Sequence, residues 1–195
     1  TLALEQVKFS ALNSVVEGTL TIEDLLEPRY RAGINGRIDL TALHSIVDGL
    51  PLQFTGGFLE PDLEIHGRIT GMGGPEREIS FTPGGALLLK DIGIGIPGPG
   101  LSFNEINGEL LLDGNWWNTS LNAVFLGSEF RITMRNNLPF AYLMGGGNLE
   151  LSALVESQTA NLDKLTGSLQ ALNDTSSTSW PDRVKVDLDF RFGEL

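Results

Sequence analysis

Apolar and polar residues alternate along most of the chain. The alternation is clearest between Ser102 and Arg135, where three runs are separated by Asp113-Gly114-Asn115 and by Gly127-Ser128. A period of two places successive side chains on opposite faces of a β-strand. This stretch therefore predicts three antiparallel strands joined by turns, with one apolar face and one polar face.

The same pattern recurs on both sides of that stretch. Val16 to Ile22 and Ala32 to Leu40 alternate before it, and Val184 to Phe192 is the most regular run of the chain. All runs together predict about ten to twelve strands. Gly56-Gly57 suggests a β-bulge. Glycine and proline clusters predict turns between further strands, among them Glu27-Pro28-Arg29, Glu60-Pro61-Asp62 and Pro83-Gly84-Gly85.

Two short segments have helical spacing instead. Leu40, Leu43, Ile46 and Val47 share one helix face, with Asp39 or Thr41 as a candidate cap and Gly49 as a stop. The leucines between 162 and 172 suggest a second short helix. A helix of eight or nine residues is unstable alone and has to pack on a sheet.

The predicted fold class is therefore all-β, mainly antiparallel, with two short helices. We expect residues 1–195 to form a single elongated segment. Ten strands at about 4.8 Å each give a sheet roughly 45 Å across. Four glycines fall on the apolar face, where a missing side chain either lets the sheet coil tightly or leaves a track for a ligand: Gly18, Gly36, Gly67 and Gly108.

Composition narrows the function classes. The formal charge of −12 opposes nucleic-acid binding and docking on an anionic membrane, and the chain has no run of basic residues. The absence of cysteine excludes disulfides, thiolate metal sites and cysteine nucleophiles. No apolar run approaches the roughly 20 residues of a membrane-spanning helix. Because the alternation is already under way near Thr1 and reaches almost to Leu195, we expect a segment of a longer protein.

Candidate chemistry is sparse. His44 and His66 lack metal-ligand spacing, and we interpret both as solvated or locally satisfied. Neither a nucleophile elbow nor a zinc-protease motif occurs, so we expect no catalytic residue, metal or cofactor and no enzymatic activity. Asp187 and Asp189 are interpreted as a solvated strand face. Trp116-Trp117 is interpreted as a plug at the edge of the core, with contact to sugar or a membrane interface as the alternative.

Three segments resemble the AsmA-like family, including TamB-type proteins. Asn35 to Leu43 matches a strand with an internal glycine followed by a short helix. Ile106 to Gly114, continuing into Leu121 to Met134, is similar to the family's repeating strand unit. Val184 to Phe192 is similar to the strand that follows a polar loop in the same proteins.

The resemblance implies a function in lipid handling. AsmA-like proteins are anchored in the inner membrane, cross the periplasm of double-membraned bacteria, and form an open groove with an apolar interior. For this chain the resemblance implies a curled open sheet, shaped like a taco or groove, or an incomplete barrel. They are linked to phospholipid transport between the membranes and to outer-membrane assembly. The partners it implies are a phospholipid or another acyl-chain lipid, neighbouring segments of the parent chain, and outer-membrane assembly proteins, without nucleic acid.

The candidate groove lining consists of the apolar positions of the clearest strands. These are Ile106, Leu110, Leu112, Leu121, Phe125, Phe130, Ile132, Met134, Leu149, Leu151, Val186, Leu188 and Phe190. The same alternation is compatible with a structural β-sandwich or adhesin-like scaffold whose apolar faces seal each other and bind no lipid. The sequence leaves both readings open.

Overall fold

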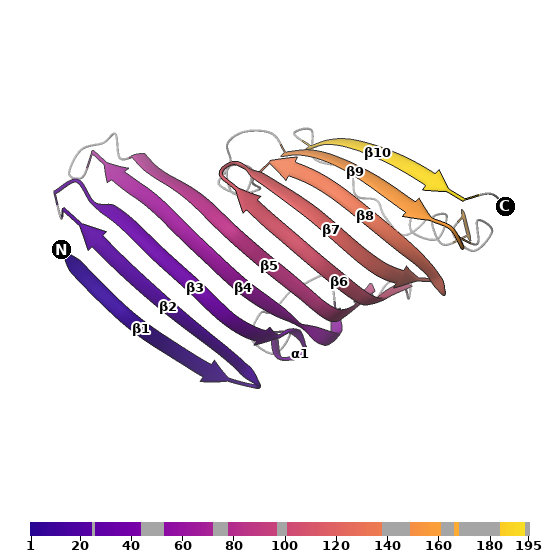
Figure 1. Ribbon diagram of the computed structural model, residues 1–195, viewed down its shortest axis with the longest axis horizontal. Coiled ribbons are helices and arrows are strands. Elements are labelled where there is room, and N and C mark those ends of the chain that lie inside the picture. Colours follow the sequence, from indigo (N-terminus) through magenta and orange to yellow (C-terminus); the bar gives the residue numbers. More distant parts are fainter. Residues whose placement is uncertain are drawn as a thin grey trace.

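The computed structural model of the chain describes residues 1–24, 26–43, 53–71, 78–96, 101–137, 149–160, 166–167 and 184–193. Ten strands form one sheet in which every strand is hydrogen-bonded to its neighbours in sequence (Figure 1). They are β1 (Leu2–Ala11), β2 (Ser14–Glu23), β3 (Arg29–Asp39), β4 (Gln53–Thr70), β5 (Glu78–Ile96), β6 (Leu101–Asp113), β7 (Trp116–Phe125), β8 (Ser128–Asn137), β9 (Leu149–Ser157) and β10 (Val184–Phe192).

The sheet is open and almost entirely antiparallel. Every neighbouring pair from β1 to β9 is antiparallel, and only β9 and β10 run parallel. β1 and β10 lie at opposite ends of the sheet and do not meet (Figure 1). The all-β prediction is therefore confirmed, and the described strands form an open sheet, not a closed barrel.

The stretch from Ser102 to Arg135 forms the predicted three strands, β6, β7 and β8. Gly114 and Asn115 connect β6 to β7. Leu126 and Gly127 connect β7 to β8 with φ angles of 52° and 78°. Two consecutive residues with positive φ match the hairpin turn whose twist fits right-handed strands. Gly127 adopts this conformation without strain, since it has no Cβ.

Two of the predicted turns are wrong. Glu60-Pro61-Asp62 lies inside the continuous strand β4, and Pro83-Gly84-Gly85 lies inside β5. Proline is tolerated in a sheet where it does not have to donate to the ladder. On the side of β4 that faces β3, the pairing is interrupted between Asn35 and Ile38, opposite Pro61. The N–H that proline lacks is therefore not needed for a pair with β3. The predicted bulge at Gly56-Gly57 is confirmed by register shifts on both sides of Gly56.

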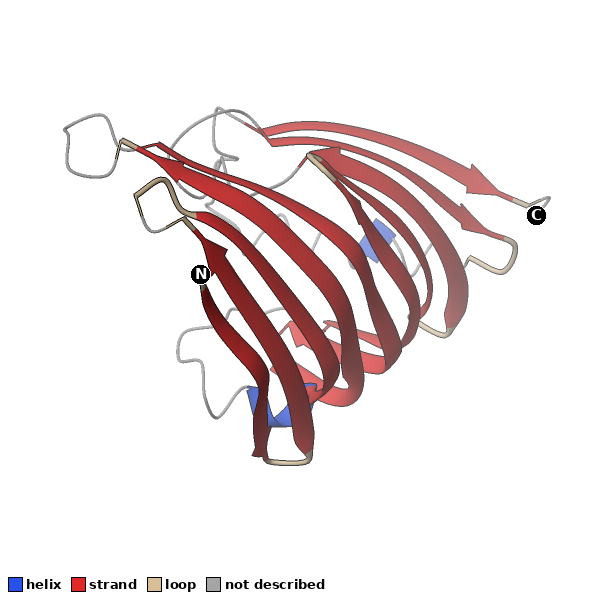
Figure 2. Cartoon of the chain, turned by 60° about the vertical axis from the view of Figure 1, so that its left-hand side comes forward, coloured by secondary structure: helices blue, strands red, loops and turns tan. Residues whose placement is uncertain are grey.

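The strands bend along their length, and the sheet is strongly curved (Figure 2). Glycine permits the close approach of neighbouring backbones at two points. A Cβ on Gly108 would collide with the Ser120 carbonyl oxygen on β7, and a Cβ on Gly36 would collide with that of Val15 on β2. The missing side chains therefore serve tight coiling of the sheet at these two positions.

A single helical turn, α1 (Leu40–Leu43), follows β3. The Asp39 carboxylate accepts a hydrogen bond from the backbone N–H of Thr41 at 3.0 Å, as an N-cap does. The rest of the predicted helix at 40–47, and nearly all of the one at 162–172, lie outside the described residues, so both helices remain predictions. No helix in the part of the chain that the structure describes is long and apolar enough to cross a membrane.

Candidate functional site

The register of the strands gathers the apolar positions on one face of the sheet, which we call the apolar face. Directly paired residues of neighbouring strands point to the same side. Gly108 pairs with Leu121, Leu121 with Ile132, and Ile132 with Val155. The parallel pair Phe190 and Val155 then extends this face onto β10. All thirteen predicted lining residues have backbone positions on the apolar face; the side chains of Leu149 and Val186 are not described.

The apolar face extends further than the sequence-based list of lining residues. The pairs Leu4–Leu20, Leu20–Ala32, Ala32–Ile65 and Ile34–Leu63 continue it across β1 to β4, and Pro61–Leu87 and Leu87–Leu110 join it to β6. The alternation of β2 and β3 was already visible in the sequence. The sequence does not reveal the register of the strands. In the structure, the register shows that the apolar residues of β1 to β5 and those of β6 to β10 form one surface.

Two clusters bury the centre of this face. The central cluster consists of Leu40, Ile92, Ile106 and Ala123, and the partly buried Leu121 packs against it. The phenylalanine cluster consists of Leu101, Phe125 and Phe130, with Ile132 packed against it. The rings of Phe103 and Phe125 stack with centroids 4.3 Å apart. Aromatic stacking of this kind adds to the stabilisation from burial alone.

Leu112 and Ala153 are also buried, but towards both ends of the sheet the apolar face is much less covered. None of the described side chains has an exposed fraction below 2%. Phe9 on β1 is 59% exposed, and Leu188 and Phe190 on β10 are 49% and 51% exposed. In a two-layer protein the second layer would bury such side chains. The described strands form one layer, so these side chains remain open to solvent.

Three buried polar atoms interrupt the apolar face on β7 and β8. Among the described residues, the indole Nε1 of Trp117, the hydroxyl of Thr119 and the Oδ1 of Asn136 have no hydrogen-bond partner. Trp117 and Asn136 are direct cross-strand partners. An unsatisfied buried polar group costs about 1–3 kcal/mol, so these positions are a local weakness of the sheet. Trp117 is partly buried on this face, whereas Trp116 lies on the opposite face with the Arg135 guanidinium 4.4 Å from its ring centroid, so the pair does not form one plug.

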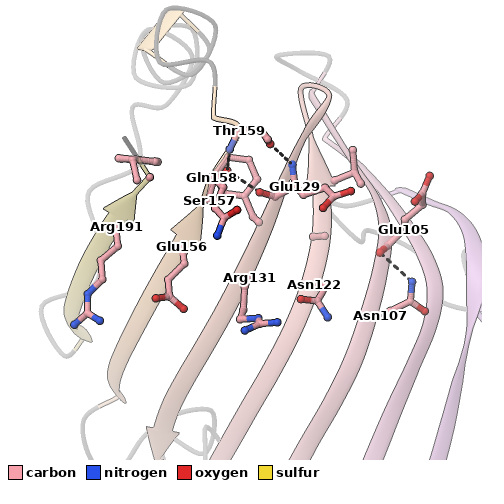
Figure 3. A pocket seen from close by; sticks show the side chains of 15 residues that line it. Glu105, Asn107, Asn122, Glu129, Arg131, Glu156, Ser157, Gln158, Thr159 and Arg191 are labelled. Atoms are coloured by element: carbon pink, nitrogen blue, oxygen red, sulfur yellow. Dashed lines mark hydrogen bonds between the residues drawn. The ribbon is translucent and has the colours of Figure 1, made fainter. Parts of the chain in front are cut away.

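The opposite face, the polar face, carries a cleft of about 830 Å³ near the ends of β6 to β10. One row of side chains crosses it: Asn107, Asn122, Arg131, Glu156 and Arg191 (Figure 3). The Ser157 hydroxyl donates to the Glu129 carbonyl oxygen at 2.6 Å and fixes β9 beside β8. Opposite charges alternate along the row, so it has no strong preference for an anion or a cation.

The candidate titratable side chains that the structure describes on the polar face are exposed to solvent. The Nε2 of His66 lies 3.2 Å from the Glu64 carboxylate, and both side chains are exposed. Asp187 and Asp189 are exposed on β10, as a solvated strand face requires. No group of three or more potential metal ligands occurs among the described residues. His44 lies outside the described residues.

Comparison with known proteins gives no relative. A scan against protein-family models finds no match, and searches of curated proteins and of solved structures find none either.

Proposed function

We propose that the chain is a segment of an AsmA-like protein and that its apolar face binds the acyl chains of phospholipids. The proposed location is the periplasm of a double-membraned bacterium, with the parent chain anchored in the inner membrane. The proposed role is phospholipid transport between the inner and outer membranes, or outer-membrane assembly. The observation that carries this proposal is the continuous apolar face, half exposed, of a single ten-stranded sheet.

The exposed apolar side chains of this face favour binding of a partner that covers them. Soluble monomers rarely expose contiguous apolar patches larger than a few hundred Å². The exposed apolar side chains here are consecutive positions of a face, such as Leu2, Leu4, Val7 and Phe9 on β1. An acyl chain gains about 0.8 kcal/mol for each CH₂ removed from water, so partial cover of one chain supplies several kcal/mol.

The burial pattern supports the apolar face as the inner side of the curved sheet. On β2 the apolar-face residues Val16 and Leu20 are half-buried, and the polar-face residues Glu17 and Thr19 are exposed. β3 and β7 show the same alternation over most of their length. Side chains on the inner side of a curved sheet crowd together, whereas those on the outer side spread apart. An inner apolar face is a trough in which acyl chains lie while the headgroups remain in water.

The open edges support the proposal that neighbouring segments of the parent chain continue the sheet. Within the part of the sheet that the structure describes, β1 and β10 each pair on one side only. An unpaired strand edge presents backbone N–H and C=O groups that another strand can bind. Outer-membrane assembly proteins remain proposed partners on the resemblance alone.

The test compares two charged variants of the same strand. Ile132 on β8 lies on the apolar face, and its neighbour Thr133 is exposed on the polar face. Uptake of a fluorescent phospholipid and lipid mass spectrometry of the purified chain are measured for Ile132→Asp and Thr133→Asp. We expect Ile132→Asp to lose lipid binding and Thr133→Asp to retain it.

A second variant separates lipid loss from unfolding. Leu188 is 49% exposed, so Leu188→Asp places a charge on the apolar face without burying it fully. We expect this variant to keep the circular dichroism of the folded sheet and to bind less lipid. If the unmodified chain neither co-purifies with lipid nor takes up the probe, the groove proposal is wrong and a scaffold without lipid remains.

A further inference from the structure

The polar face brings three arginines together at one end of β3 and β4. Arg29 on β3 pairs directly with Arg68 on β4, and Arg31 pairs directly with His66. Since residues two apart share a strand face, these four side chains form a two-by-two block. β2, β3 and β4 are adjacent in the sheet (Figure 1). Thr21 of β2 pairs with Arg31. We call this group the arginine corner: Arg29, Arg31, Arg68, His66 and Thr21.

The backbone holds the arginine corner in place. The N–H of Ile69 donates to the Pro28 carbonyl oxygen at 2.8 Å, which fixes the connection between β2 and β3 beside the end of β4. The Tyr30 hydroxyl donates to the Ser80 carbonyl oxygen at 3.0 Å and links β3 to β5. Arg29 and Arg31 flank Tyr30 in sequence, so the strand that carries them is anchored between them.

Carboxylates lie beside the corner, those of Glu23, Asp24, Glu27 and Glu64, but they do not engage all of its arginines in ion pairs. Glu27 forms an ion pair with Arg68 at 2.7 Å, and Glu64 lies beside His66. Glu23 pairs with Arg29 in the register. Within the described residues, neither the Arg29 nor the Arg31 guanidinium forms an ion pair. Like charges directly opposite each other destabilise a sheet, so the Arg29–Arg68 pair carries a cost, which the ion pair of Arg68 with Glu27 offsets in part.

The corner also forms a concavity. Its side chains line a hollow of about 370 Å³ whose lining includes all three arginines and one carboxylate, that of Glu23. Of these arginines, Arg68 is already paired with Glu27. The arginine side of this hollow offers fixed forks of N–H donors, and Thr21 adds a hydroxyl. Guanidinium forks match the oxygens of a phosphate group in pairs. A carboxylate has only two oxygens and cannot engage three such forks.

We propose that the arginine corner binds a phosphate group. The group can belong to a soluble phosphate or to the headgroup of a phospholipid, because the contacts are the same for both. This site lies on the polar face and does not depend on lipid binding by the apolar face. The sequence showed no basic run because Arg31 and Arg68 become neighbours only through the register of β3 and β4.

The test follows the arginine side-chain signals in NMR spectra of the full chain. Inorganic phosphate and dihexanoyl phosphatidic acid, a short-chain lipid used below its micelle concentration, are the two probes. We expect shifts at Arg29, Arg31 and Arg68, and an affinity about tenfold weaker in Arg31→Gln, as loss of one charge-assisted contact predicts. The control is Arg131→Gln, an exposed polar-face arginine of β8, which should leave the affinity unchanged.

The two probes distinguish the sources of phosphate. Equal affinities assign the site to soluble phosphates, and a clear preference for the lipid assigns it to a headgroup. Leu188→Asp should not change the affinity for inorganic phosphate, so failure of the apolar-face proposal leaves this result standing. The proposal is overturned if neither probe shifts the corner, or if Arg131 responds as strongly as Arg31. Lower unfolding stability in Arg31→Gln with unchanged affinity also overturns it.

Discussion

The ring of Tyr30 lies across Gly67, and a Cβ at position 67 would collide with the ring and with the Ser80 carbonyl oxygen. The two residues are direct cross-strand partners on the apolar face. The space beside Gly67 is therefore occupied by a neighbouring side chain and is not open to a ligand. Tyr30 fills the space that the glycine leaves.

We expect Gly67→Ala to destabilise the chain by about 1–3 kcal/mol, because overpacking displaces the Tyr30 ring. Urea denaturation measures this loss. Burial raises the pKa of the Tyr30 phenol, so displacement of the ring should lower this pKa towards its ordinary value in a spectrophotometric titration. In a Tyr30→Ala background the cost of Gly67→Ala should shrink but persist, because the Ser80 carbonyl remains. An unchanged stability and phenol pKa would contradict the contact.

Two phenylalanines on the same face should differ sharply in their contribution to stability. Phe125 is 8% exposed and stacks on Phe103, whereas Phe9 is 59% exposed on the first strand. We expect Phe125→Ala to cost about 3 kcal/mol or more and Phe9→Ala less than about 1 kcal/mol. Equal losses in denaturant unfolding would mean that the burial of the face is uniform, contrary to the two clusters described above.

Thr119 offers a substitution that should stabilise the protein. Its hydroxyl is buried without a hydrogen-bond partner, and valine has nearly the same shape. We expect Thr119→Val to raise the unfolding free energy by about 1 kcal/mol, because the unsatisfied polar group is removed. Thr133→Val, at an exposed position of β8, is the control and should change stability by less than about 0.5 kcal/mol. A loss of stability in Thr119→Val would indicate an unrecognised partner for the hydroxyl.

The connection after β2 should respond to acid. The Asp24 carboxylate accepts hydrogen bonds from the backbone N–H of Leu26 at 3.0 Å and of Glu27 at 3.4 Å. These two hydrogen bonds first, and the charge of Arg29 to a smaller degree, lower the pKa of Asp24 below its ordinary value. A lowered pKa in the folded state gives a stabilisation that is present above the unfolded pKa and lost as pH falls through the folded one.

Asp24→Asn should therefore be less stable than the unmodified chain at neutral pH. The difference in unfolding free energy should vanish once the pH falls below the folded-state pKa of Asp24. Urea denaturation across this pH range measures the gap, and the carboxyl carbon signal of Asp24 reports its pKa directly. An unshifted pKa, or a gap that widens in acid, would contradict the hydrogen bonds.

The sequence predicted strands well where local alternation was sufficient. Val184 to Phe192 and the three strands from Ser102 to Arg135 follow from the period of two. The errors fell at Pro61 and at Pro83-Gly84-Gly85, because residues that usually form turns lie inside strands of 18 and 19 residues. Whether a proline ends a strand depends on what the neighbouring strand needs from it, which local sequence does not encode.

The candidate surfaces depended on register even more strongly. The thirteen lining residues could be chosen from alternation, but their continuity with β1 to β5 could not. The arginine corner gave no local signal, since Arg31 and His66 become neighbours only through the pairing of β3 with β4. The parallel pairing of β9 with β10 likewise had no signature in the sequence.

The strict sequence order of the strands has a consequence for how the sheet forms and fails. Because each strand pairs only with the strands before and after it, the described sheet is a one-dimensional array of neighbour contacts. Its stability is then approximately a sum of terms between adjacent strands. Folding can begin at one hairpin, such as that of β7 and β8, and spread outward in both directions. Unfolding should start at the edge strands β1 and β10 and proceed towards the centre of the sheet.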